Sequence, residues 1–192
     1  MSNNVRSAEL SDLQGIKALY QDISEKYPDS LSPFQTEITD DFIYDGLSSA
    51  LERGAAMIMT DVNDDIIAYF KGYTSKNIRK AHVLDNMTIV IRSDYMSTMA
   101  AYRFCKEMFV FTEQNMPHIK YGKCMPHAVN SRSLRLLQSL NMNKISCEKG
   151  VIFCANGSFV DEVVLMWENK NFTYKSLMMY HKYLLKDKQL IS

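Results

Sequence analysis

The junction between an apolar strand and the helix that follows it has the residue pattern of an anion-binding site. The run His82–Ile91 ends in β-branched residues, Arg92–Asp94 interrupts it, and a helix is expected over Ser97–Gln114. The first turn of a helix has backbone amides without intrahelical partners and the positive end of the helix dipole, so it attracts phosphate. The same donors bind only water at many such turns, and Ser97 or Thr98 also suits the helix N-cap alone.

Cysteine and histidine side chains give weaker signals. Cys124 and His127 form a single Cys-x-x-His pair, and Cys147 and Cys154 follow later in the chain. Structural zinc sites use paired Cys-x-x-Cys spacing, so we expect no metal. No local signature marks any of the four cysteines, Cys105 included, as a nucleophile, and we expect all four to be packing residues.

The composition predicts one globular domain over residues 1–192. The chain is 46% hydrophobic and 23% charged, and its longest apolar runs have five residues, so no segment is expected to cross a membrane. Lys and Arg number 22, as do Asp and Glu, which leaves no basic excess for binding nucleic acid. The first residues lack the apolar stretch of a signal peptide, so we expect a cytoplasmic location.

Hydrophobic periodicity predicts an α/β fold with a mixed sheet. The helix over Ser97–Gln114 is apolar almost all round and is expected to be buried between layers, and the final helix, from Tyr174, is amphipathic. The other expected helices span 11–27, 39–54 and 130–141, and the expected strands are 55–60, 66–73, 82–91, 118–124, 144–147, 151–154 and 159–167.

Three stretches carry a resemblance to a known family. Val5–Leu13 has a hydrophobic-Arg-x-Ala pattern before an Asp, Met87–Ala100 joins an apolar strand to a helix start, and Asn130–Met142 opens a leucine-striped helix with Asn. With the order of elements, they resemble the GNAT superfamily of acyl-CoA-dependent N-acyltransferases over nearly all of the chain. The resemblance implies a twisted, mostly antiparallel sheet of about six to seven strands, flanked by helices, with a further helix at the C-terminus.

The sequence departs from the family's motifs at three positions. In the acyl-CoA signature Gln/Arg-x-x-Gly-x-Gly/Ala, Tyr95 replaces the first residue and Thr98 replaces the first glycine, whereas Ala100 fits. Leu137 occupies the place of the tyrosine that many members use to protonate the departing thiolate. Leucine cannot donate a proton, but a CoA thiol leaves without much help, so this change slows such a reaction without abolishing it.

The resemblance also implies roles for particular residues. The turn amides would bind pyrophosphate, strand backbone would align the pantetheine arm and thioester, and two residues of the Asn-led helix would flank the CoA arm. These expected cofactor-binding residues are Met96, Ser97, Thr98, Met99 and Ala100, then Ile89, Val90 and Ile91, then Asn130 and Ser133. For the catalytic base the strand offers His82 and Asp85, which lie on opposite faces by alternation, so that without a bulge at most one points toward the cleft.

The resemblance implies transfer of an acetyl or other short acyl group from acetyl-CoA, or another acyl-CoA, to a primary amine by direct attack. The alternative is a catalytically degenerate module of the same fold, which binds acyl-CoA or a protein partner without turnover; Tyr95, Thr98 and Leu137 favour it. The acceptor amine is not identified by the sequence. The oligomeric state stays open, and a homodimer is one option.

Overall fold

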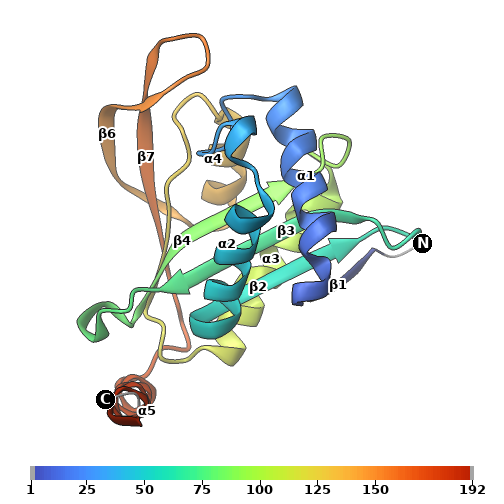
Figure 1. Cartoon of the computed structure of the whole chain (residues 1–192). Coiled ribbons are helices and arrows are strands. Elements are labelled where there is room, and N and C mark those ends of the chain that lie inside the picture. The colour runs from blue at the N-terminus through green and yellow to red at the C-terminus, as the bar shows by residue number, and fades with distance from the viewer. Residues whose placement is uncertain (1–2, 191–192) are drawn as a thin grey trace.

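The computed structural model describes residues 3–190, with side chains up to residue 186, and shows one seven-stranded sheet flanked by helices (Figure 1). The strands are β1 (Asn4–Ser7), β2 (Gly54–Thr60), β3 (Ile66–Thr74), β4 (Val83–Ile91), β5 (Tyr121–Cys124), β6 (Asn143–Phe153) and β7 (Phe159–Glu168). The α-helices are α1 (Leu13–Lys26), α2 (Asp40–Arg53), α3 (Met99–Asn115), α4 (Ser131–Ser139) and α5 (Tyr174–Leu190). The ends of the domain expected over 1–192 lie outside the described residues.

The strand order is β1-β2-β3-β4-β5-β7-β6, and every neighbouring pair is antiparallel except β4 and β5. The parallel pair is joined by α3, which is the crossover helix that parallel neighbours require. The predicted fold class, a mixed and mostly antiparallel sheet with a C-terminal helix, is confirmed. Within residues 3–190, no helix has both the length and the apolarity needed to cross a bilayer.

Helices cover both faces of the sheet. In Figure 1, α1 and α2 lie in front of it and α3 lies behind it. Alternate residues of β2 serve the two layers, because Met57 and Met59 join the core that includes α3, whereas Ala56 and Ile58 join the core under α1 and α2. Burial on both faces explains why this strand reads as an uninterrupted apolar run.

The prediction that the third helix is buried between layers is wrong. One side of α3 is buried, with Phe104 and Met108 at no more than 1% exposure, but Tyr102 and Val110 on the other side are exposed. Apolar residues on all sides of this helix therefore do not indicate a second covering layer. The exposed side of α3 instead mixes Tyr102 and Val110 with charged residues such as Arg103 and Lys106.

Two strand boundaries also differ from the prediction. The strand predicted from His118 begins at Tyr121, because the chain first forms a turn. In this turn the Ile119 amide donates to the Met116 carbonyl oxygen. The Asn169 side chain donates to the carbonyl oxygens of Met116 and Ile119. The two strands predicted over 144–147 and 151–154 are one strand, β6, interrupted by an irregularity around Gly150, whose φ is +60°.

Two leucines of α2 that differ in burial provide a test of this layering. Leu47 is fully buried and Leu51, one turn later, is 44% exposed. We expect Leu47→Ala to lower the free energy of unfolding by about 2–5 kcal/mol, because it leaves a cavity under the helix, whereas Leu51→Ala should cost less than about 1 kcal/mol. Urea denaturation of the two variants measures this, and equal losses would contradict the packing described.

Candidate active site

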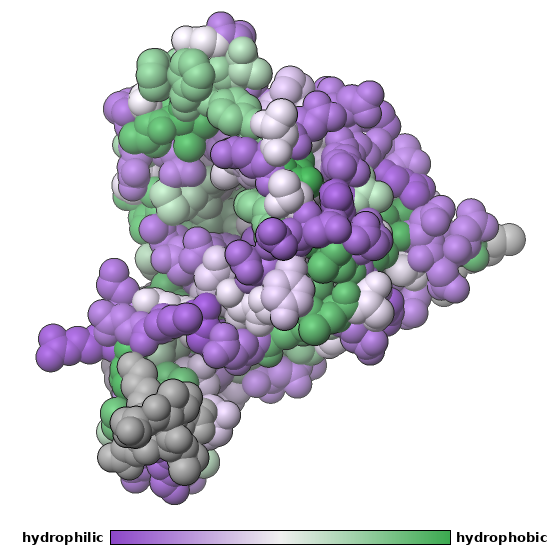
Figure 2. Space-filling model, in the orientation of Figure 1, coloured by the Kyte–Doolittle hydropathy of each residue, from purple (hydrophilic) through white to green (hydrophobic). Residues whose placement is uncertain are grey.

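The sheet splits where β4 and β5 diverge. The two strands are paired from Val83 to Met87, whose partner is Cys124, the last residue of β5. Beyond this point Thr88–Ile91 keeps β3 on one side and faces a cavity of about 750 Å³ on the other. Figure 2 shows the molecule hollowed between the β6–β7 hairpin and the α1–α2 side, with apolar residues at the floor.

A β-bulge in β4 lies at the point of divergence. Between the pairs Tyr73–Asp85 and Lys71–Thr88, Gly72 alone faces two residues of β4, Asn86 and Met87. Asn86 has a φ of +51°, and its amide donates to the Asp85 carboxylate at 2.9 Å. A bulge bends its strand and increases the local twist. The bulge therefore directs the second half of β4 away from β5 and exposes its edge.

The turn between β4 and α3 forms one end of the cavity. Met96, Ser97 and Thr98 line it, and Ser97 has a φ of +63°. Thr98 is the N-cap of α3, and its Oγ1 accepts from the Ala101 amide, which leaves the amides of Met99 and Ala100 without an intrahelical partner. The turn thus offers outward-facing backbone donors at the positive end of a 17-residue helix.

Eight of the ten residues predicted to bind cofactor line this cavity: Ile89, Val90, Ile91, Met96, Ser97, Thr98, Asn130 and Ser133. Met99 and Ala100 do not line it, although Ala101 in the same helical turn does, and the Met99 side chain is 77% exposed. Their predicted contribution was through backbone amides, which this orientation leaves unchanged.

The helix α4 supplies a second wall. Asn130 is its N-cap and accepts from the Ser133 amide at 3.1 Å, so this side chain stabilises the helix and also lines the cavity. Leu137 is 3% exposed and lines the cavity as well. A buried leucine therefore lies at the position where the family resemblance places a tyrosine.

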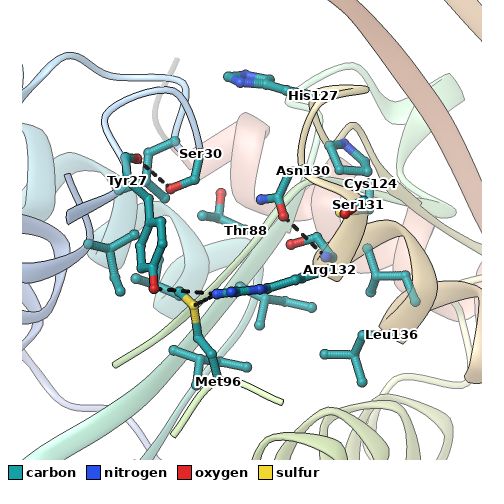
Figure 3. Close-up of a pocket in the computed structure, with 18 of the residues that line it drawn as sticks. Tyr27, Ser30, Thr88, Met96, Cys124, His127, Asn130, Ser131, Arg132 and Leu136 are labelled. Carbon is teal, nitrogen blue, oxygen red and sulfur yellow. Dashed lines mark hydrogen bonds between the residues drawn. The ribbon is translucent and has the colours of Figure 1, made fainter. Parts of the chain in front are cut away.

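Three basic side chains line the same cavity, although the chain as a whole has no net charge. They are Lys26, Arg132 and Arg135, and the cavity's acidic lining residue is Asp29. Lys26 is paired with the Asp22 carboxylate. Figure 3 shows Arg132 reaching from α4 toward Tyr27 and Met96. Its Nη1 donates to Tyr27 Oη at 3.3 Å, and the guanidinium lies 5.5 Å from the centre of the tyrosine ring. No local sequence pattern marks these basic residues as ligand-binding.

The loop after α1 covers the cavity. Ala155, in the turn between β6 and β7, donates its amide to the Asp29 carboxylate at 2.9 Å. His127 donates from Nδ1 to the Asp29 carbonyl oxygen, also at 2.9 Å. One residue of the loop is therefore fixed to two segments on the far side of the split.

The two residues predicted as catalytic bases lie outside this space. Asp85 and His82 line neither this cavity nor the second one described below. The Asp85 carboxylate accepts from the Asn86 amide and so stabilises the bulge. His82 immediately precedes β4, at the end far from the split, and its carbonyl oxygen accepts from the amides of Lys120 and Tyr121. Their side-chain roles in catalysis stay predictions.

Cys124 is the one cysteine that lines the main cavity among the described residues. Burial raises the pKa of its thiol to about 12. The thiol donates a hydrogen bond from Sγ to the Met87 carbonyl oxygen at 3.6 Å. A neutral thiol is a poor nucleophile, so covalent catalysis by Cys124 does not fit this site. Within the described part of the chain, no three His, Cys, Asp or Glu side chains form a group able to hold a metal ion.

A second cavity of about 430 Å³ adjoins the first. Leu31, Ser32, Met87 and Thr88 line both, so the two cavities meet at the β4 bulge. The rest of the second cavity is formed by aromatic side chains, two charged residues, a proline and an amide: Tyr20, Phe42, Tyr73, Glu37, Lys71, Pro33 and Asn86.

Sequence comparison finds little. No protein-family model matches this chain. A stretch of 51 residues is 37% identical to Protein MGF 110-13L of African swine fever virus (isolate Portugal/Lis 57/1957). The matched stretch is 26% of this chain and 44% of that protein. The chain thus matches less than half the length of this curated relative.

Structural comparison finds many similar folds. A GNAT superfamily phosphinothricin acetyltransferase from Sinorhizobium meliloti, solved with AcCoA, has a TM-score of 0.78 and 14% identity over 90% of this chain and 91% of its own. A GNAT acetyltransferase from Streptococcus pneumoniae has a TM-score of 0.73 and 17% identity over 87% of this chain and 99% of its own. A ribosomal-protein-S5-alanine acetyltransferase from Vibrio fischeri has a TM-score of 0.73 and 15% identity over 90% of this chain and 96% of its own. The chain therefore has the fold of the GNAT superfamily of N-acetyltransferases.

Proposed function

We propose that this protein transfers an acetyl or other short acyl group from acyl-CoA to a primary amine by direct attack, and that residues 1–192 act as one domain. The observation that carries the proposal is the 750 Å³ cavity at the split in the sheet, with an exposed strand edge along one side and backbone donors with basic side chains at its end. A CoA thioester has the matching chemistry, because it joins an amide-containing arm to a charged pyrophosphate.

The residues of the cavity suggest binding roles for three parts of acyl-CoA. The turn amides between Met96 and Ala100 bind the pyrophosphate, except that of Thr98, which donates to the Tyr95 carbonyl oxygen. Arg132 lies beside them, and preorganised amides at a helix N-terminus favour anions. The edge of Ile89–Ile91 pairs with the amides of the pantetheine arm, as a sheet edge pairs with an added strand. This places the thioester near Met87 and Thr88, where the two cavities meet.

The acceptor enters from the second cavity. Its neutral amine nitrogen attacks the thioester carbonyl carbon, the C–N bond forms, and the C–S bond breaks. The thiolate of CoA leaves, and one proton of the attacking nitrogen passes to a base, directly or through water. Glu37 is the carboxylate that lines the second cavity, so we assign it this role in preference to Asp85 and His82.

The degenerate module remains the second candidate, and specific observations favour it. Leu137 is a buried apolar residue that cannot protonate the thiolate, and the two predicted bases lie outside the cavities. A module would bind acetyl-CoA and release no thiol with any amine. Release of CoA with even one amine, detected by a thiol reagent, would exclude it.

Arg132 provides a test of cofactor binding. At acetyl-CoA concentrations about 100-fold above the dissociation constant, we expect stabilisation of about 2.7 kcal/mol, which is a rise in Tm of about 5 to 10 °C. Arg132→Gln should weaken acetyl-CoA binding about 10-fold or more, because a charged hydrogen-bond donor is lost. Arg79→Gln, at an exposed residue outside both cavities, is the matched control. The absence of any shift at millimolar acetyl-CoA would refute the proposed cofactor site.

Glu37 provides a separate test of the proton transfer. Glu37→Gln retains an oxygen that can accept from the Phe34 amide, as Glu37 does now at 2.7 Å, but cannot take up a proton. We expect kcat/KM to fall about 100-fold, with acetyl-CoA affinity unchanged. Glu25→Gln, on the exposed side of α1, should have no effect. An unaltered rate in Glu37→Gln, together with a loss in Asp85→Asn, would assign the base to Asp85 instead.

A further inference from the structure

The second cavity contains a buried lysine without an acidic partner. Lys71, on β3, is 9% exposed and lines this cavity. Among the residues whose side chains the structure describes, none forms a hydrogen bond or ion pair with its ammonium group. Buried ammonium groups in proteins are nearly always paired. An unpaired one facing a cavity therefore calls for an explanation.

The surrounding residues fix the position of Lys71. Its Nζ lies 5.4 Å from the centre of the Phe42 ring, which gives a cation–π contact. Gly46, one turn further along α2, leaves space for the ammonium group, because a Cβ at that position would overlap Nζ. Burial lowers the pKa of Lys71. The helix thus holds the ammonium group at a defined place without neutralising it.

The charges around the cavity indicate what a ligand must provide. Its two charged lining residues are Lys71 and Glu37, and one carboxylate oxygen of Glu37 already accepts from the Phe34 amide. Aromatic rings of Tyr20, Phe42 and Tyr73 form much of the remaining wall. A ligand that suits this lining has an apolar body, a negative group for Lys71 and an amine toward Thr88, where the cavities meet.

We propose that Lys71 binds a negatively charged group of the acceptor, so that the acceptor is a small primary amine carrying a carboxylate, as a free amino acid does. This inference rests on the proposed function, since it identifies the class of molecule that the second cavity presents to the thioester. A carboxylate next to the ammonium group supplies the counter-ion that the described residues do not, and charge-assisted hydrogen bonds of this kind are the stronger ones.

The test compares matched probes on matched variants. The probes are L-phenylalanine and L-methionine and the carboxamides of both, which keep the amine and the side chain and lose only the negative charge. The amine of a carboxamide has the lower pKa, so a preference for the acids cannot come from amine reactivity. The variants are Lys71→Met, which keeps the length of the side chain, and Lys76→Met, at an exposed lysine outside both cavities.

Calorimetric binding and thiol release give independent readouts. We expect the acids to bind the unmodified protein about 10-fold or more tightly than their carboxamides, and Lys71→Met to remove this preference while Lys76→Met keeps it. Unchanged acetyl-CoA affinity in Lys71→Met shows that this variant is folded, because Lys71 does not line the main cavity. Equal binding of acids and carboxamides, no binding of either acid at millimolar concentration, or a preference that survives in Lys71→Met would overturn the inference.

The two proposals fail in different ways. If the acids bind through Lys71 and no thiol is released from acetyl-CoA, acyl transfer is refuted and the anion site stands. If thiol is released with acids and carboxamides at equal kcat/KM, acyl transfer stands and the role of Lys71 is refuted.

Discussion

The bulge at Asn86 and Met87 is the constraint on which the rest of the site depends. Before it, β4 and β5 are paired as parallel neighbours, and after it Thr88–Ile91 has a partner on one side only. A continuous sheet would satisfy these backbone groups and leave no room for a ligand. Because β4 bends here, the edge of the strand, the start of α3 and the start of α4 all face one space.

Charge is distributed unevenly around that space. The chain has as many basic as acidic residues, and its average charge indicates no preference for anions. Yet Lys26, Arg132 and Arg135 line the main cavity against the acidic Asp29, and Lys71 lies unpaired in the second. Electrostatic recognition depends on this local arrangement, because charges separated by more than about 10 Å are screened in solution. The net charge of the chain shows no basic excess, and it does not bear on these two small sites.

Much of the fold could be predicted from the sequence, because its elements leave local signals. Alternation and helical periodicity located the strands and helices, and the turn after Ile91 was identified from the break in the apolar run. The errors also have local causes. Some apolar residues of α3, such as Tyr102 and Val110, lie on its exposed side, and Gly150 interrupts β6 without ending it. Periodicity records which residues are apolar, not what covers them.

The candidate site was predictable only in part, for a physical reason. Thr98 and Asn130 cap their helices, a role that depends on their own segments, and both line the cavity. Their part in binding cofactor stays a prediction. Arg132, Lys71 and Glu37 acquire a possible role only when distant segments meet, so no local pattern marks them. Alternation along the strand allows at most one of Asp85 and His82 to face the cleft, and the Asp85 carboxylate accepts from the Asn86 amide in the bulge.

The central claim is that acetyl-CoA occupies the split beside β4. Hydrogen exchange of the full chain, with and without saturating acetyl-CoA, tests it most directly, because backbone amides that pair with a ligand exchange more slowly. The account predicts slower exchange of the amides within 88–91 and 96–100 on binding. It predicts no change in β1, an edge strand that is three strands away from β4. Binding of acetyl-CoA that leaves exchange in both segments unaltered would contradict it.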